Sequence, residues 1–496
     1  MPRYIIDEAK LEANLQVLAL VRERAGVKIL LAQKAFSCFK LYPLVAKYLD
    51  GATASGLFEA RLAHEEMPGK ENHVFAPAFR AEDMPELLRV VNHIVFNSPR
   101  QVEKFSAMAR AAGVSVGLRV NPEVSVATTP AYDPCRLGSR LGVTREGLDA
   151  AWGGSQFTAT DDSDAINCVP PVTDAQERVP PIDGLHFHCL CEQGVEELRK
   201  VLAGFEAKFG DLLPQMKWVN FGGGHHITRA DYDVDGLVEL LLDFRRRYPH
   251  LTVYLEPGEA VALDAGTLEA TVLEIQPPGA DGISNAILDV SAACHMPDVL
   301  EMPYTPRCGV EKLRGCDVER LRCCDVEKLR GCDVERLRGC DVEKLRGCDV
   351  EKLRGYDVEK LRGCDVEKEK NSTLQRLNAS TPQHPNASTS QRLNTSTLQR
   401  LNTSTSQRLN ASTPQHHYYR FGGPTCLAGD VIGTYSFPRP LAEGDTVVFE
   451  DMAIYSMVKN NTFNGMPLPD IAVRRKSGEI EVLRSFGYAD FKMRLG

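Results

Sequence analysis

The sequence lacks the features of a membrane protein or a nucleic-acid-binding protein. No run of 18 apolar residues occurs in it, which excludes a helix that spans a membrane. Its 58 Lys and Arg residues are outnumbered by 67 Asp and Glu residues, and the formal net charge is -9. A basic surface for nucleic acid or anionic lipid is therefore not expected. The first residues lack the apolar core of a signal peptide, so we expect a cytoplasmic protein whose thiols stay reduced.

An octapeptide repeat accounts for many of the 15 cysteines. From about Gly309 to Glu369 the sequence cycles through GCDVEKLR, and from Asn371 to about Gln415 a unit close to LNTSTSQR recurs. Eight residues turn a helix through about 800°, so the apolar residues of successive repeats form no single stripe. The second tract has too few apolar side chains to offset its ordering entropy. We predict a disordered insertion over residues 309–416, with a small solenoid as the alternative.

A metal-binding array in this tract is the other alternative for its cysteines. The repeated thiols lack the paired CxxC spacing and the neighbouring histidines of a zinc site. We therefore predict no metal site in the protein.

The rest of the chain divides into two patterns. Up to residue 265, short apolar runs such as KILLAQ, HVFAPA, HIVFN, WVNFGG and LTVYLEPG alternate with amphipathic segments. This alternation predicts a (β/α)8 barrel over residues 15–265, with a loop insertion at 153–181. Short alternating strands separated by Gly and Pro then predict an all-β domain of residues 266–308 and 417–496, which residues 1–14 join. The fold class is therefore α/β with a C-terminal all-β domain.

A barrel carries its chemistry at the C-terminal ends of its strands. Lys34 follows an apolar run directly, and partial desolvation there would favour the neutral amine that forms an imine. A lysine that only reaches out to solvent is the alternative, and Lys40 competes for the same role. The other residues at predicted strand ends are Arg119, His188, Gly222, Gly223, Gly224 and Glu256.

These strand-end residues together suit pyridoxal phosphate. A glycine triplet lets the backbone approach a phosphate closely, although it is also common in tight turns. Glu256 could keep a pyridine nitrogen protonated, so that the ring can accept the electrons of a breaking bond. His188 could stack on that ring or be an ordinary core histidine. The set predicts a pyridoxal phosphate enzyme.

Several longer stretches carry a narrower resemblance. They are DGATASGLFEARLAHEE, HFHCLCEQ, NFGGGHHIT, LEPGEA, LDVSAACHMPDVLEMPY, GGPTCLAGDVIG and NTFNG. The chain resembles the alanine-racemase-like (fold III) decarboxylases, and within them the carboxynorspermidine (carboxyspermidine) decarboxylase family. That resemblance implies decarboxylation of carboxynorspermidine, carboxyspermidine or both, giving norspermidine or spermidine in polyamine biosynthesis.

Two alternatives stay open beside this function. One is a decarboxylase of another basic amino acid (ornithine, arginine or diaminopimelate) on the same fold, and the other is a non-catalytic protein that binds pyridoxal phosphate. Glu259 stands where ornithine and diaminopimelate decarboxylases usually carry an arginine after the EPG turn. This departure argues against diaminopimelate as the substrate.

The resemblance also implies roles for individual residues. Lys34 would form the imine with the cofactor, His188 would stack on the ring, and Glu256 would pair with the ring nitrogen. The phosphate would be held by Gly222, Gly223, Gly224 and Tyr455, with Arg119 near the cofactor. Cys426 would protonate the substrate carbon from the partner subunit, which implies a homodimer with shared sites. The acidic residues that could bind the cationic substrate are Glu259, Asp289 and Asp430.

Overall fold

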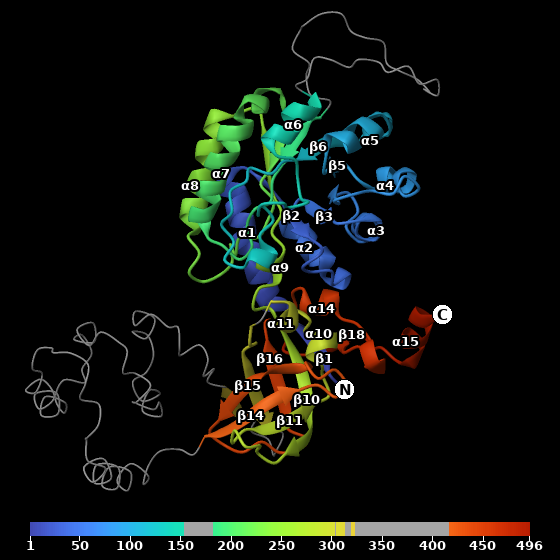
Figure 1. The fold of residues 1–496 in the computed structure, drawn as a ribbon, viewed down its shortest axis with the longest axis vertical. Helices are drawn as coiled ribbons and strands as arrows, with labels where there is room; N and C mark the ends of the chain where they lie inside the picture. Colours follow the sequence, from blue (N-terminus) through green and yellow to red (C-terminus); the bar gives the residue numbers. More distant parts are fainter. Residues whose placement is uncertain (153–181, 303, 313–318, 323–415) are drawn as a thin grey trace, which may run out of the picture.

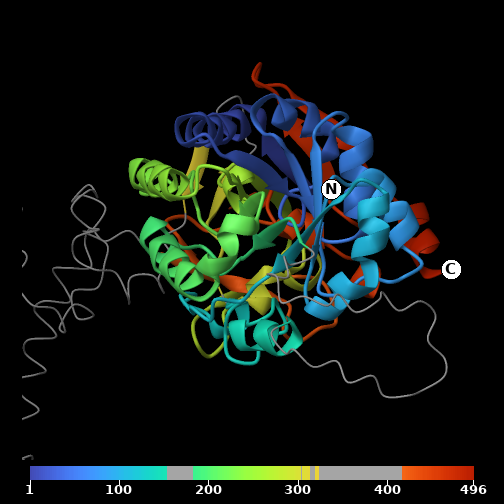
Figure 2. The same ribbon diagram turned by 90° about the horizontal axis from the view of Figure 1, so that it is seen from above.

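The computed structural model describes residues 1–152, 182–302, 304–312, 319–322 and 416–496. It contains a barrel and a sheet domain that lie one above the other in Figure 1. Eight parallel strands close the barrel in the order β2 to β9. The helices that connect them surround the barrel, as the view from above shows (Figure 2). The predicted fold class, a (β/α)8 barrel with a C-terminal sheet domain, is confirmed.

The barrel strands are short, and each is followed by a longer connection. They are β2 (Lys28–Ala32), β3 (Gly51–Ala54), β4 (Glu71–Phe75), β5 (His93–Phe96), β6 (Ser115–Arg119), β7 (Gly184–His186), β8 (Trp218–Asn220) and β9 (Thr252–Leu255). The helices are α1 (Glu8–Ala25), α2 (Tyr42–Tyr48), α3 (Leu57–Glu66), α4 (Met84–Val90), α5 (Pro99–Ala111), α6 (Arg145–Trp152), α7 (Val195–Phe209), α8 (Val234–Arg247) and α9 (Glu259–Ala262). Short 3-10 turns are η1 (Phe39–Leu41), η2 (Pro130–Tyr132) and η3 (Gly210–Gln215).

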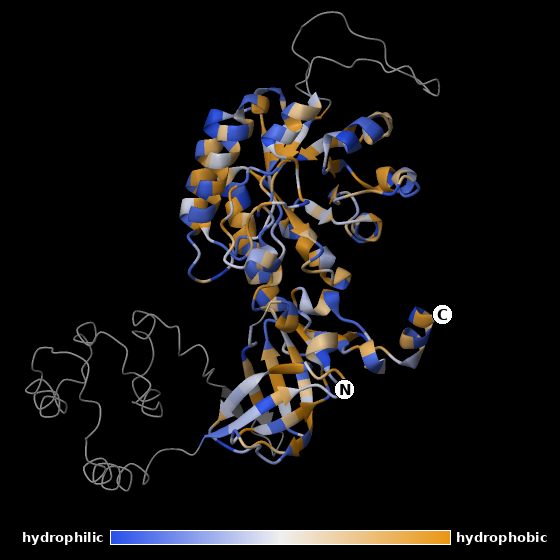
Figure 3. Ribbon diagram, viewed as in Figure 1, coloured by the Kyte–Doolittle hydropathy of each residue, from blue (hydrophilic) through white to orange (hydrophobic). Residues whose placement is uncertain are grey.

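Local sequence signals set the ends of these helices. The Asp7 side chain accepts hydrogen bonds from the amides of Ala9 and Lys10 at the start of α1, and Gly26 ends the helix with φ +64°. These are the expected N-cap acid and C-terminal glycine of a helix. Figure 3 shows apolar residues concentrated on the barrel strands, whereas the surrounding helices carry both apolar and polar residues. The helices therefore bury one face against the barrel.

The barrel interior is filled below the strand ends. Leu30, Val95, Trp218 and Tyr254 form a small apolar cluster of their own, against which Phe75 packs. The Trp218 ring lies over two glycines, and a Cβ on Gly117 or Gly184 would come within 2.3 or 2.1 Å of it. The barrel therefore needs glycine beside this tryptophan.

The second domain is a ten-stranded sheet built from both ends of the chain. One path through it runs β13-β12-β16-β10-β1-β17-β18, and β11, β14 and β15 branch from β10. Its strands are β1 (Arg3–Asp7), β10 (Gly266–Gln276), β11 (Ser284–Leu288), β12 (Cys308–Lys312), β13 (Glu319–Arg322), β14 (His417–Gly422), β15 (Val431–Phe437), β16 (Thr446–Glu450), β17 (Asp470–Arg474) and β18 (Ile480–Arg484). Its helices are α10 (Ala292–His295), α11 (Asp298–Glu301), α14 (Ser456–Lys459) and α15 (Tyr488–Leu495), with a 3-10 turn η9 (Phe463–Gly465).

The sheet domain extends into the predicted repeat insertion through β12 and β13, so the prediction of disorder over residues 309–416 is wrong at 309–312 and 319–322. Residues 309–312 belong to strand β12, which pairs with β16 over Cys308 to Glu311, and Val310 is fully buried. The repeat pattern obscures this strand because GVEK looks like part of another octapeptide, although its valine packs in the core. The predicted loop insertion at 153–181 and the tract from 323 to 415 lie outside the described residues. Within the described part of the chain, no helix is long and apolar enough to cross a membrane.

Candidate active site

A pocket lies at the C-terminal ends of the barrel strands. It brings together four residues predicted from the strand ends: Lys34, Arg119, His188 and Glu256. They come from the ends of β2, β6, β7 and β9, so the barrel gathers side chains that are far apart in sequence. The complete lining is Ala32, Lys34, Thr53, Ala54, Ser55, Phe75, Arg119, His186, His188 and Glu256.

Lys34 lies two residues beyond β2, and its side chain is accessible within the pocket. Desolvation by the surrounding protein lowers the pKa of Lys34, and the nearby Arg119 lowers it further, against the opposing effect of Glu256. A lowered pKa increases the share of neutral, nucleophilic amine. Lys40, the competing lysine, lies in η1 with Nζ 4.9 Å from the centre of the Phe39 ring, and it does not line the pocket.

Glu256 is held by a buried asparagine at the end of the neighbouring strand. Asn220 Nδ2 donates to Glu256 Oε1 over 2.7 Å, and Asn220 Oδ1 accepts from the Gly222 amide over 2.8 Å. The other carboxylate oxygen, Oε2, is 3.6 Å from His186 Nε2. Asn220 therefore ties the carboxylate to the glycine loop and fixes their relative position.

The glycine loop that follows β8 needs glycine at each of its three positions. Gly222 and Gly224 have φ of +69° and +86°, and a Cβ on Gly223 would come within 2.0 Å of the Glu256 carbonyl oxygen. The amides of Gly222 and Gly223 are already bonded to Asn220 Oδ1 and His188 Nδ1. Because these two amides are occupied, a phosphate would meet the backbone at Gly224 and beyond.

His188 is fixed by the same loop. Its Nδ1 accepts the Gly223 N–H over 2.9 Å, so the ring hydrogen of the neutral imidazole lies on Nε2. Burial holds the pKa of His188 well below its usual value, and the neighbouring Lys34 and Arg119 lower it further. The ring is therefore neutral, which suits stacking on an aromatic cofactor.

Arg119 is buried beneath the pocket. Its guanidinium donates to the His188 carbonyl oxygen over 3.1 Å and lies 4.5 Å from the centre of the Phe75 ring. Burial lowers the pKa of Arg119 to about 10, so the group keeps its charge at neutral pH. This cation lies close enough to lower the pKa of Lys34, as noted above.

Tyr455 connects the sheet domain to the active-site loop. Its amide donates to the Ala35 carbonyl oxygen over 2.9 Å, one residue after Lys34, and its φ of +31° is strained for a non-glycine residue. Burial raises the pKa of the Tyr455 phenol. Its side chain is not among those that line the pocket.

The three acidic residues suggested for substrate binding lie outside the pocket lining. Glu259 accepts from His226 Nε2 over 2.9 Å at the start of α9. Asp289 accepts from the Thr271 amide over 2.7 Å and so joins β10 to the end of β11. Asp430 is buried and accepts from Ser291 Oγ and Thr425 Oγ1 over 2.9 and 2.6 Å. Asp289 and Asp430 are therefore engaged in holding the sheet domain together.

Cys426 does not reach this pocket within one chain. It lies in the exposed loop between β14 and β15, which Asp430 organises, and its Sγ is 3.8 Å from Asn464 Nδ2. Leu427 and Phe463, on the same part of the surface, are also exposed.

Sequence reasoning missed three polar residues that line the pocket, Thr53, Ser55 and His186, and it missed Asn220, which bonds to Glu256. His186 and Asn220 each end a barrel strand, so the strand-end rule could have found them had the strand ends been known. Both ring nitrogens of His186 are buried and have no hydrogen-bond partner among the described residues. A polar ligand would satisfy them. The accessible amine, the anchored carboxylate, the glycine loop and these unpaired nitrogens together fit pyridoxal phosphate.

Comparison with known proteins supports this chemistry. The model of the family "Pyridoxal-dependent decarboxylase, C-terminal sheet domain" matches residues 365–453. A carboxynorspermidine/carboxyspermidine decarboxylase of Campylobacter jejuni is 34% identical over 99% of this chain and 98% of its own length. A carboxyaminopropylagmatine decarboxylase of Synechocystis is 33% identical over 100% of this chain and 95% of its own.

Solved structures agree with the sequence relatives. The structure of carboxynorspermidine decarboxylase from C. jejuni in complex with norspermidine is 32% identical, with a TM-score of 0.67, over 100% of this chain and 99% of that one. Diaminopimelate decarboxylase from Helicobacter pylori in complex with L-lysine has a TM-score of 0.62 over 100% of this chain and 96% of that one, at 14% identity. That second likeness is one of fold alone.

Proposed function

Because this chain belongs to the carboxynorspermidine/carboxyspermidine decarboxylase family of pyridoxal-dependent decarboxylases, we propose that it decarboxylates carboxynorspermidine and carboxyspermidine. The products are norspermidine and spermidine, together with CO2. The observation that carries the proposal is the convergence of Lys34, His188 and Glu256 on one pocket at the C-terminal end of the barrel. The full-length similarity to decarboxylases that act on carboxylated polyamines supports the choice of substrate.

Each pocket residue has a task that follows from its surroundings. Bound pyridoxal phosphate supplies an electron sink next to the substrate carbon. Lys34, with its lowered pKa, is the amine that would hold the cofactor. Glu256, fixed by Asn220, offers an acceptor oxygen to the protonated ring nitrogen. His188 presents a neutral ring, and its bond to Gly223 keeps that ring in one orientation.

The phosphate end has a different set of residues. Gly224 and the residues that follow it offer the backbone for the phosphate, since the amides of Gly222 and Gly223 are bonded within the loop. Tyr455 is the phenol that would contact the phosphate, and its amide already ties it to the Lys34 loop. Arg119 would supply a fixed positive charge in the pocket lining.

The last step requires a proton for the substrate carbon, and Cys426 is the donor in this proposal. Its Sγ would carry that proton into the pocket of a second subunit, because the thiol is exposed and lies outside its own chain's pocket. The active form would therefore be a cytoplasmic homodimer with two shared sites. The exposed Leu427 and Phe463 beside Cys426 support an interface at this surface.

The test is a comparison of substrates with the purified full chain and added cofactor. CO2 release is measured from carboxynorspermidine, carboxyspermidine, carboxyaminopropylagmatine, ornithine and diaminopimelate, with Lys34→Ala as the inactive control. We expect the first two to be turned over with the highest kcat/KM. Preference for carboxyaminopropylagmatine would assign the chain the substrate of its Synechocystis relative instead. Preference for ornithine or diaminopimelate would overturn the polyamine substrate.

A further inference from the structure

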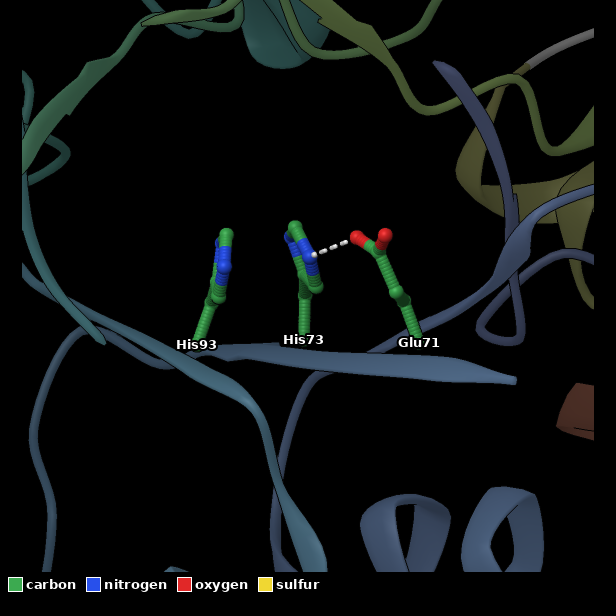
Figure 4. Close-up of side chains that lie close together, drawn as sticks. All are labelled: Glu71, His73 and His93. Carbon is green, nitrogen blue, oxygen red and sulfur yellow. Dashed lines mark hydrogen bonds and ion pairs between the residues drawn. The ribbon is translucent and has the colours of Figure 1, made fainter. Parts of the chain in front are cut away.

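The opposite end of the barrel carries a second group of polar side chains. Glu71 and His93 are the first residues of β4 and β5, and His73 lies two residues along β4. Figure 4 shows the three side chains rising next to one another from the two neighbouring strands, with His73 in the middle. We call Glu71, His73 and His93 the barrel floor, and none of them lines the active-site pocket. The proposed decarboxylation uses none of the three.

The floor residues are close together and incompletely bonded. His73 Nε2 is 3.3 Å from Glu71 Oε2, and the two imidazole rings stack with centres 4.0 Å apart and planes 28° from parallel. His73 is 1% exposed. The Nδ1 atoms of both His73 and His93 are buried without a hydrogen-bond partner among the described residues. Nearly all buried polar atoms in proteins are paired, so two unpaired nitrogens on adjacent rings indicate a missing partner.

We propose that Glu71, His73 and His93 form a binding site for a divalent transition-metal ion of the zinc and nickel class. One potential ligand atom from each residue lies within 4.8 Å of the other two. A tetrahedral ion with bonds of about 2.0–2.1 Å needs its ligand atoms about 3.4 Å apart, so a modest turn of the two rings is required. Two imidazoles with one carboxylate are a donor set that such ions prefer over Mg²⁺ or Ca²⁺. Glu71 is partly exposed, which gives the ion a route from solvent.

Lys28 competes with the metal ion for the carboxylate. Its ammonium group bonds to Glu71 Oε1, and the Tyr254 hydroxyl donates to Oε2 over 2.9 Å. In the metal-free protein, Lys28 therefore neutralises the charge that the ion would neutralise. A bound cation must displace this ammonium group or tolerate its repulsion. Removal of the lysine charge should accordingly tighten metal binding.

Trp218 provides a local readout of occupancy. Its ring is 5.1 Å from that of His93, with the planes 21° from parallel. A paramagnetic ion such as Ni²⁺ quenches a fluorophore at this distance. The chain has 2 tryptophans, so Trp152→Phe leaves Trp218 as the sole source of tryptophan fluorescence. Thiols elsewhere in the chain can also bind Ni²⁺, but only an ion near the floor will quench this emission strongly.

The experiment titrates Ni²⁺ into the full-length holoenzyme that carries Trp152→Phe. We expect saturable quenching of Trp218, reversed by excess diamagnetic Zn²⁺. His93→Phe keeps the ring stack and removes both nitrogens, and it should weaken binding by at least about tenfold. Lys28→Gln should shift the titration to lower Ni²⁺ concentration. His64→Phe, an exposed histidine on α3, is the matched control and should leave the curve unchanged.

Other results would overturn the proposal. Absence of saturable quenching in the parent protein would mean that the histidines only stack. Equal quenching in the parent and in His93→Phe would place the ion elsewhere. If His93→Phe does not fold, as judged by circular dichroism, His93→Gln replaces it with the same expected loss of affinity and the same contrary result.

Discussion

The substitution Asn220→Asp isolates the anchoring of Glu256 from the rest of the site. Asn220 is completely buried, and it donates from Nδ2 to Glu256 Oε1 over 2.7 Å while its Oδ1 accepts from the Gly222 amide. Aspartate keeps an acceptor for that amide but replaces the donor with a second carboxylate oxygen. Two carboxylates in contact cannot both be ionised, so the pair will hold a proton. Glu256 then no longer acts as a full anion toward the ring nitrogen.

The size of the effect follows from the lost bond. A hydrogen bond to a charged group contributes about 1.5–3 kcal/mol, and Glu256 is only 11% exposed, so solvent screens it little. We therefore expect the cofactor to bind about 10- to 150-fold more weakly, with a lower kcat in the saturated enzyme.

The assay is a titration of the apoenzyme with pyridoxal phosphate, followed by visible absorbance, with thermal unfolding measured in parallel. Asn121→Asp is the matched control, since this asparagine is also buried and accepts from a backbone amide, at Glu123, whereas the bond to Glu256 comes from Asn220. Unchanged cofactor affinity in Asn220→Asp, at a Tm near that of the control, would refute the anchoring role.

Three further predictions concern other parts of the molecule. Lys34→Ala should remove the covalent attachment of the cofactor, seen as loss of its visible absorbance band, and reduce turnover by several orders of magnitude; substantial retained activity would assign the role to another lysine. Mixing inactive Lys34→Ala and Cys426→Ala subunits should restore up to about one quarter of the wild-type activity, since half of randomly formed dimers would hold one intact site; well-exchanged mixtures that stay inactive would place both residues in one chain's site. Burial raises the pKa of Asp451 from 3.8 to about 6, so the ionised carboxylate destabilises the folded state. This free-energy cost is absent below about pH 4 and develops as the pH rises through 6. Asp451→Asn keeps the acceptor for the Asp264 amide and suits φ +60°. It should raise Tm at pH 8, because it removes a cost of about 3 kcal/mol, and it should give no gain at pH 4. An equal gain in Tm at both pH values would contradict the titration of Asp451.

The barrel and the residues at its strand ends could be predicted because each β/α unit carries its own signal. Lys34 and Glu256 directly follow short apolar runs, and closing the barrel brings such positions together. Asn220 and His186 were missed because each is followed by a phenylalanine, so the sequence does not show that the strand ends at the polar residue. Their importance follows only from facing the barrel interior.

Features that depend on contacts between distant segments could not be predicted in this way. Strand β12 begins at Cys308 and enters the repeat tract, β13 lies within that tract, and only their pairing with each other and with β16 identifies them as strands. The tie between Tyr455 and Ala35 joins residues about 420 positions apart, through backbone atoms that carry no sequence signal. The same applies to Cys426, whose role rests on a second subunit.

The position of strand β1 has a consequence for how the protein is made. β1 pairs with β10 on one side and, in parallel, with β17 on the other, so it needs Asp470–Arg474, which are synthesised long after it, to complete its pairing. At about 5–20 residues per second, those residues follow it by roughly half a minute or more. The barrel segments emerge during that delay, while the tyrosine and isoleucines of β1 (Tyr4, Ile5 and Ile6), buried in the finished protein, lack one of their neighbours. An unpaired apolar strand edge is a site for association with other chains. We therefore expect β1 to need protection from association during synthesis, and a bulky fusion before Arg3 to hinder its pairing with β17.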